Sequence, residues 1–264
     1  MIDKNQVKLH FSKNAKSYDQ YAVVQKNMAN ALLSQIKISK NTSINILEIG
    51  CGTGYLTNML INYFPSGNIT AIDIAEGMIN EAKKNTSSIN INFKCCDIEE
   101  VNLNDTYDLI ISNATFQWFN NLNSTINKLY RLLNENGVLL FSTFGENTFN
   151  ELHSSYKKAS LELNMPNYSC GQDFLSCNTL KNIILRTTNT KPTINEYTET
   201  HYFPSCSEFF KSIKKVGASN SNTSNRCLSP SYLKKVIDIY SSSFNKDNNI
   251  YSTYHYLLVS INRK

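Results

Sequence analysis

Short apolar runs alternate with stretches of helical periodicity along the first half of the chain. In the helical stretches, such as 55–64 and 122–133, apolar residues recur every three or four positions. The apolar runs lie at 44–49, 68–73, 90–96, 107–113 and 138–144. Runs that are apolar on both faces are typical of central parallel strands, and strands alternating with helices favour right-handed crossovers. The pattern therefore predicts an α/β fold, with helices on both faces of a mostly parallel sheet.

Both ends of the chain depart from this alternation. Residues 7–37 read as one helical segment with an apolar face, so we expect a helical cover over the main domain. The helix that starts at Leu122 is expected to close at Asn136–Gly137. Two further helices are expected beyond Gly145, at about 147–163 and 173–185.

The last strands enclose a long insertion. Residues 192–203 alternate as a strand does, and 252–261 form the final strand; a helix is expected at 231–244 between them. Because no compositional linker interrupts the chain, we expect a single domain, 1–264. Its expected parts are a cover at 1–40, a core at 41–145, and a C-terminal part at 146–264 with a lid-like insertion at about 204–249.

The first apolar run ends in a glycine-rich turn with the pattern E-x-G-x-G-x-G, from Glu48 to Gly54. Alternating glycines allow positive φ and let a ligand approach the main chain. The dinucleotide fingerprint G-x-G-x-x-G fails, because Tyr55 stands three places after Gly52. The alternative is a tight turn that binds nothing. The segment ILEIGCGTGYLT resembles motif I of the class I S-adenosylmethionine-dependent methyltransferases, which implies a Rossmann-like, seven-stranded sheet.

Acidic residues follow the next two strands as well. Asp73 lies about 20 residues after the glycines, where a carboxylate can accept hydrogen bonds from ribose hydroxyls. Asp97 is placed to accept from an adenine amino group, or is simply a turn or N-cap aspartate. Ile74 and Ile98 either line the adenine slot or pack in the core. The resemblance implies cofactor contacts from His10, Phe11, Tyr18, Glu48, Gly50, Cys51, Gly52, Gly54, Asp73, Ile74, Met78, Asp97, Ile98, Asn113 and Phe116.

Composition narrows the class of partner. The net charge is +5, and no block of like charge resembles a nucleic-acid-binding arm. The seven cysteines include no C-x-x-C pair, so neither a disulfide framework nor a metal site is indicated. The start, MIDKNQVKLHF, lacks the apolar core of a signal peptide, and no run is long enough for a membrane span. We expect a cytoplasmic protein, without nucleic-acid or membrane partners, whose weakly basic surface favours an acidic protein.

Several segments together resemble the BioC family, the malonyl-acyl-carrier-protein O-methyltransferases of biotin synthesis. They are HFSKNAKSYDQYAVVQKNMANALL, the glycine turn, SNATFQWF, ELH, SIKKVGAS and the closing TYHYLL, and they cover nearly the whole chain. The resemblance implies methyl transfer from S-adenosylmethionine to the free carboxylate of a malonyl thioester on acyl carrier protein. A malonyl carboxylate, with a pKa near or below ~4, is ionised at neutral pH, so no general base is needed.

The expected catalytic residues are therefore groups that position the carboxylate. Tyr18 would donate its hydroxyl near the methyl group, and Gln117 and Trp118 would form the pocket wall. His153 would donate to the carboxylate, although some relatives carry arginine there, and it could equally be a surface residue. Contact with the carrier, or with the phosphate of its prosthetic arm, is expected from three lysines that could otherwise simply be solvated: Lys211, Lys214 and Lys215.

Two other functions fit the same motifs. One is a small-molecule methyltransferase acting on a free carboxylic acid or a quinone precursor, for which a base near the methyl group would be expected. The other is a non-catalytic assembly factor that binds the same cofactor.

Overall fold

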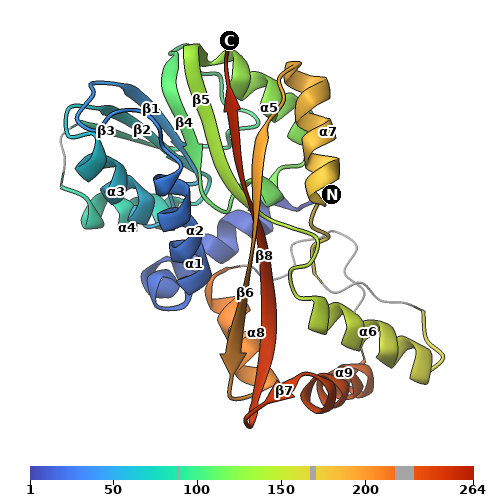
Figure 1. The fold of residues 1–264 in the computed structure, drawn as a ribbon. Helices are drawn as coiled ribbons and strands as arrows, with labels where there is room; N and C mark the ends of the chain where they lie inside the picture. Colours follow the sequence, from blue (N-terminus) through green and yellow to red (C-terminus); the bar gives the residue numbers. More distant parts are fainter. Residues whose placement is uncertain (88–89, 167–170, 218–228) are drawn as a thin grey trace.

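A computed structural model describes residues 1–87, 90–166, 171–217 and 229–264. Its sheet has the strand order β3-β2-β1-β4-β5-β8-β6 (Figure 1). The first five strands are parallel, and β8 and β6 are antiparallel to their neighbours. The strands are β1 Asn45–Ile49, β2 Asn68–Asp73, β3 Ile91–Cys95, β4 Tyr107–Ser112, β5 Leu133–Phe144, β6 Thr193–Phe203 and β8 Asn249–Asn262, with the short β7 Asn245–Lys246 paired to β8. The expected α/β fold, with a mostly parallel sheet, is confirmed.

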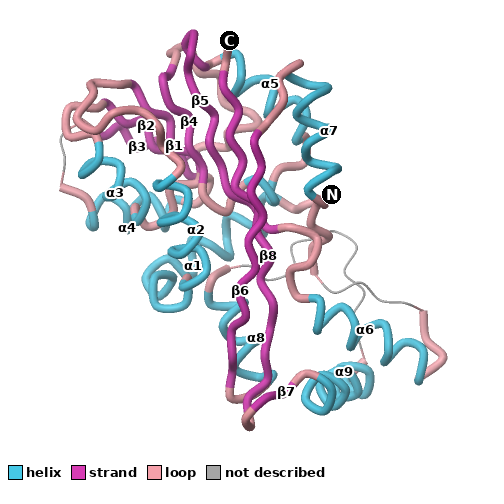
Figure 2. Tube along the Cα trace, viewed as in Figure 1, coloured by secondary structure: helices cyan, strands magenta, loops and turns pink. Residues whose placement is uncertain are grey.

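Helices cover both faces of the sheet (Figure 2). Successive residues of a strand point to opposite faces, so Ile46 packs with α2 (Val23–Ser34) and α3 (Tyr55–Tyr63), whereas Leu47 packs with α5 (Leu122–Arg131) and α7 (Cys177–Thr188). No described helix has both the length and the apolar character that crossing a membrane requires.

The N-terminal cover consists of two helices and not the single one expected. Helix α1 spans Lys4–Tyr21 and is followed by α2, and the backbone leaves helical geometry at Ala22, where ψ is 42°. The two helices bury different surfaces. Ala15 of α1 packs with Met78 of α4 (Glu76–Asn85), while α2 packs on the sheet. A break lets each helix reach its own surface.

Three other boundaries differ from expectation. Helix α5 already ends at Arg131, and Asn136, with φ 63°, lies inside β5. The pairing of β4 with β5 shifts register between Tyr107 and Leu109. Asn136 therefore belongs to an irregularity in the strand and does not close a helix. The next helices begin later than expected, as α6 (Asn150–Glu162) and α7.

The C-terminal part has a core of its own. Strands β6 and β8 continue beyond the other strands, and α6, α8 (Cys206–Lys215) and α9 (Pro230–Ser243) gather around their far ends (Figures 1 and 2). Phe209, Tyr232 and Tyr240 are fully buried there. The segment expected as an insertion at 204–249 thus lies between β6 and β8. It reaches the N-terminal cover, because a Cβ placed on Gly217 would lie 3.0 Å from the Phe11 ring.

Candidate active site

A cleft with an open volume of about 650 Å³ lies at the carboxyl ends of β1 to β4, beneath α1. Open parallel sheets place ligand sites at this edge. Helix α1 contributes Lys4, Val7, Phe11 and Tyr18 to its lining. The strand ends and the segments that follow them contribute Ile49, Gly50, Gly52, Ile72, Asp73, Ile74, Met78, Cys96, Asp97, Ile98, Asn113, Ala114, Thr115, Trp118 and Phe119.

A smaller cleft, of about 390 Å³, lies on the other side of the glycine turn. It shares Tyr18, Gly50, Gly52 and Asn113 with the larger one. Its other lining residues are Asp19, Ala22, Gln25, Lys26, Glu48, Cys51, Thr53, Tyr55 and Leu56. One ligand lying across the glycine turn can therefore reach both clefts.

The three glycines of the turn all have positive φ, and their surroundings differ. A Cβ on Gly50 would stand only 2.0 Å from Thr115 Oγ1, so the strand-four loop packs directly on the main chain. A Cβ on Gly52 would meet no atom within 4 Å, since this residue faces the open cleft. Gly54, with φ 87°, is the N-cap of α3. A side chain at position 52 would occupy ligand space.

Two buried carboxyl groups flank this turn. Asp73 accepts hydrogen bonds from the amides of Ala75, at 2.8 Å, and Gly52, at 2.9 Å. Burial raises the pKa of Asp73 to about 6, against the lowering effect of these amides. Glu48 accepts from Thr57 Oγ1 at 2.6 Å, yet burial raises its pKa to about 8. The turn thus presents one fixed carboxylate and one carboxyl group that is protonated at neutral pH.

Aromatic side chains from α1 and from the turn after β4 form part of the wall of the larger cleft. The rings of Phe11 and Trp118 meet edge to face, with centroids 5.5 Å apart. The centroid of the Tyr18 ring lies 6.4 Å from that of Phe11. Burial, helped by the charges of Asp73 and Asp19, raises the pKa of the Tyr18 phenol. Its hydroxyl therefore stays protonated and can serve as a hydrogen-bond donor.

Comparison with known proteins identifies the family. Residues 40–227 match the family model described as a methyltransferase domain. A malonyl-(acyl-carrier protein) O-methyltransferase of Priestia megaterium is 47% identical over 271 residues, covering 100% of this chain and 99% of the relative. The enzyme of the same name from Acetivibrio thermocellus is 44% identical, with coverages of 100% and 95%. This chain belongs to the malonyl-(acyl-carrier protein) O-methyltransferase family.

Solved structures agree on the fold. The YcgJ protein of Bacillus subtilis superposes with a TM-score of 0.63 at 13% identity, covering 90% of this chain and 98% of its own. A Haemonchus contortus phosphoethanolamine N-methyltransferase 2 in complex with S-adenosyl-L-methionine gives a TM-score of 0.58 at 14% identity, covering 96% of this chain and 57% of its own. At such identities the likeness concerns the fold alone.

Most of the expected cofactor residues of this methyltransferase line one or both clefts. The exceptions are His10, Gly54 and Phe116. Phe116 is 3% exposed and stacks on Phe141 with ring centroids 3.7 Å apart, as part of the core. The Nδ1 atom of His10 is buried and has no hydrogen-bond partner among the described residues. Trp118, expected at the substrate, lines the larger cleft.

The other expected residues are not among those that line either cleft. The Gln117 amide is held by the Ala114 carbonyl, at 2.6 Å, and by Thr143 Oγ1, at 3.2 Å. His153 is half-buried on α6, and burial lowers its pKa, so the imidazole is neutral. Lys211, Lys214 and Lys215 lie on α8, the first of them beside Glu208 at 3.4 Å. The roles of these residues stay predictions.

Sequence reasoning missed the polar side chains that α1 and α2 bring to the smaller cleft. Thr53 Oγ1 donates to Asp19 Oδ1 at 2.9 Å, and Lys26 Nζ donates to the Asp19 carbonyl at 2.8 Å. The stretch SYDQYAVVQK is part of the family resemblance, from which the sequence predicts a site role for Tyr18 alone. The available signal is the pair of charged residues in the same stretch, Asp19 directly after that tyrosine and Lys26 further along.

Proposed function

We propose that this protein transfers a methyl group from S-adenosylmethionine to the free carboxylate of a malonyl thioester carried on acyl carrier protein. The resulting methyl ester would start the pimeloyl chain of biotin synthesis. The observation that carries the proposal is the 44–47% identity, over the full chain, to relatives bearing that enzyme name. The described cysteines are free thiols, which fits a reducing cytoplasm.

The residues present fit the cofactor. The open face of Gly52, the carboxylates of Asp73 and Asp97, and the apolar side chains of Ile74 and Ile98 make the larger cleft suitable for an adenosine. The smaller cleft offers Asp19 and Lys26, one negative and one positive side chain. The amino acid part of the cofactor carries an ammonium and a carboxylate, which these charges would complement. When bound, this cofactor supplies an electrophilic methyl group.

The protein's own contribution is orientation and exclusion of water. Tyr18 lines both clefts, at the junction where the reacting centre would lie, and its protonated hydroxyl can donate to an incoming carboxylate. Phe11 and Trp118 form an apolar wall beside it. An apolar wall keeps water away and weakens the solvation of the attacking carboxylate. No proton has to be removed, because a malonyl carboxylate is already ionised at neutral pH.

The product chemistry gives a reason for the reaction. Esterification removes a negative charge, so an apolar pocket for chain elongation can accept an end that would otherwise be costly to desolvate. Hydrolysis of the ester later restores the acid.

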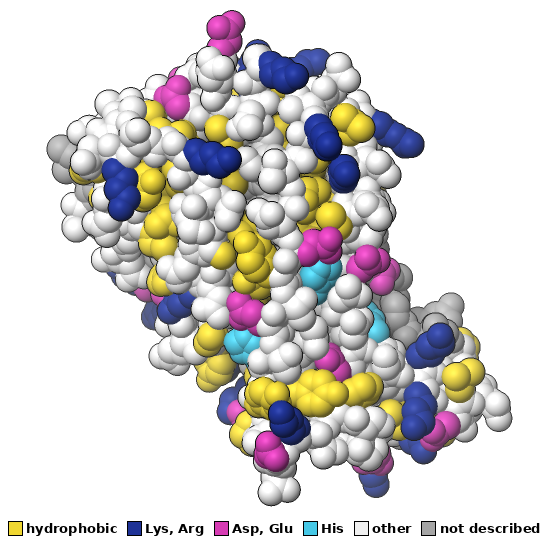
Figure 3. All heavy atoms as spheres, in the orientation of Figure 1, with side chains coloured by type: hydrophobic (Ala, Val, Ile, Leu, Met, Phe, Trp, Pro, Cys, Tyr) yellow, Lys and Arg dark blue, Asp and Glu magenta, His cyan; other side chains and the backbone are white. Residues whose placement is uncertain are grey.

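The charge distribution supports a carrier-protein partner. Residues 204–249 contain seven Lys and Arg against three Asp and Glu, a net charge of +4 out of +5 for the whole chain. Lys and Arg side chains also gather over α6 and α9 (Figure 3). Lys214 and Lys215 precede Gly217, which lies against Phe11 of the larger cleft. They are therefore the lysines best placed to meet an acidic carrier or the phosphate of its arm.

The decisive experiment supplies methyl-labelled S-adenosylmethionine together with malonyl carrier protein, malonyl-CoA or free malonate. Label should appear on a malonyl thioester and be released as methanol by mild base, as expected for a methyl ester. Label on the free acid alone would contradict the proposal.

A further inference from the structure

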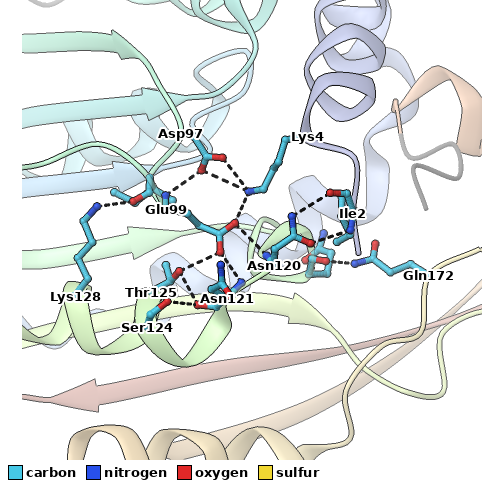
Figure 4. A network of polar contacts seen from close by, with 12 residues as sticks. Ile2, Lys4, Asp97, Glu99, Asn120, Asn121, Ser124, Thr125, Lys128 and Gln172 are labelled. Atoms are coloured by element: carbon cyan, nitrogen blue, oxygen red, sulfur yellow. Dashed lines mark hydrogen bonds and ion pairs between the residues drawn. The ribbon is translucent and has the colours of Figure 1, made fainter. Parts of the chain in front are cut away.

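The ammonium group of Lys4 is shared by two carboxylates at the edge of the larger cleft. Lys4 Nζ lies 2.6 Å from Glu99 Oε2 and 3.2 Å from Asp97 Oδ2 (Figure 4). The three side chains are 23%, 9% and 11% exposed, so the contact is largely shielded from solvent. The positive charge between them offsets the repulsion of the two carboxylates.

Glu99 connects this ammonium to a second loop. It accepts hydrogen bonds from the amides of Asn120, at 3.0 Å, and Asn121, at 2.7 Å, and from Thr125 Oγ1 at 3.3 Å. Asn120 in turn forms two hydrogen bonds with the backbone of Ile2, at 2.8 and 3.0 Å. Residues 2–4 are therefore fastened both to the turn after β3 and to the start of α5.

The same contact fixes Asp97. Its Oδ1 accepts from the Glu99 amide at 2.9 Å and lies 3.4 Å from Lys4 Nζ. Lys4 itself lines the cleft together with Asp97 and Phe119, and its ammonium stands 5.5 Å from the centroid of the Phe119 ring. The carboxylate therefore faces the cleft in one orientation, with acceptor capacity left over on both oxygens.

We propose that Lys4 is a positioning residue for the cofactor. It holds the Asp97 carboxylate in the orientation that accepts a hydrogen bond from the adenine amino group, and it fastens α1 over the adenine end of the cleft. This inference rests on the proposed function, because it assumes that an adenosine occupies the larger cleft.

The test compares two nucleosides by calorimetry, S-adenosylhomocysteine and S-inosylhomocysteine, in which oxygen replaces the adenine amino group. A hydrogen bond to a charged group contributes enough that Lys4→Met should weaken S-adenosylhomocysteine binding about tenfold. The ratio of the affinities for the adenosine and inosine compounds should fall about fivefold, because an Asp97 carboxylate that is no longer held in place forms a weaker hydrogen bond with the amino group. Lys4→Arg should keep most of the preference, and Lys13→Met, at an exposed position of the same helix, should leave it unchanged.

A second variant separates orientation from fastening. Asn120→Ala removes the side chain that binds Ile2 but leaves Lys4 between its carboxylates, so both nucleosides should weaken equally. If the wild type binds normally and Lys4→Met keeps the full preference for the adenosine compound, the role of Lys4 is contradicted while the proposed function stands. If the wild-type protein bound neither nucleoside, the proposed function itself would be contradicted.

Discussion

The strand-end region and the C-terminal helical region differ in what positions their functional candidates. At the strand ends, Gly52, Asp73 and Asp97 are placed by backbone geometry, because the parallel strands all end at one edge of the sheet. In the C-terminal region, His153 and the lysines of α8 project from helices around a separate core, and they do not line either cleft. A strand-end residue is positioned by the fold itself, whereas a helix residue depends on how the helix is docked.

The largest effect is expected where a side chain would enter the ligand space. Gly52→Leu should abolish measurable binding of S-adenosylhomocysteine, a loss of at least about 100-fold, because overlap with a ligand cannot be relieved on a rigid turn. Gly171→Leu is the matched control. Gly171 also has positive φ, 74°, and open space at its Cβ, but it does not line either cleft. A leucine there therefore causes the same backbone strain without occupying ligand space. Equal loss in the two variants would show that strain, and not occupancy, was responsible.

In this strand-end region, the residues that the sequence predicts for the cofactor site lie together in the structure, and their role in binding stays a prediction. The positions of Asp73, Ile74, Asp97 and Ile98 at the ends of apolar runs predict that they face a ligand, and all four line the larger cleft. The sequence does not predict the positions of Lys4, Asp19 and Lys26, because these depend on the docking of α1 and α2 and on the break at Ala22. Periodicity along one segment contains no information about which distant surface that segment meets.

The segment after β4 shows a second limit of sequence reasoning. Phe116, Gln117 and Trp118 form one turn of 3₁₀ helix, in which successive side chains point about 120° apart. Phe116 consequently enters the core, Gln117 bonds to Thr143, and Trp118 faces the cleft. The sequence marked the segment as part of the site, but the turn type decided which of its residues can touch a ligand.

A large effect on turnover is expected from Tyr18, the residue common to both clefts. Tyr18→Phe keeps the ring beside Phe11 but removes the donor. Because hydrogen bonds to charged groups contribute about 1.5–3 kcal/mol, the methylation rate should fall about 30-fold. Affinity for S-adenosylhomocysteine should change less than about threefold, since the hydroxyl is assigned to the carboxylate substrate. Full turnover in this variant would remove Tyr18 from the mechanism.

Asp73 should give binding and stability opposite dependences on pH. Its pKa of about 6 in the folded protein lies above the ordinary 3.8, so the unfolded chain releases this proton first. The Asp73 contribution to stability therefore falls as pH rises from about 4 to about 6. Ribose hydroxyls need the ionised acceptor, so affinity for S-adenosylhomocysteine should fall about tenfold per pH unit below 6.

Asp73→Asn is the control for both measurements, made by calorimetry and by thermal unfolding across pH 4 to 8. The amide cannot ionise, so subtracting the variant from the wild type isolates the contribution of this one group. Identical pH profiles in the two proteins would show that Asp73 does not titrate in this range.

The smallest effect is expected in the C-terminal region, where charge and not backbone geometry would decide. The double variant Lys214→Glu, Lys215→Glu should raise KM for malonyl carrier protein about fivefold at low salt, and less at high salt, because exposed charges are screened. If these lysines contact the acidic surface of the carrier, KM for malonyl-CoA should be the same in the variant and in the wild type. A matching loss with malonyl-CoA would instead point to the phosphate of the arm. Charge reversal at the exposed Lys181 and Arg186 of α7 is the matched control, and an equal loss there would mean that only the net charge matters.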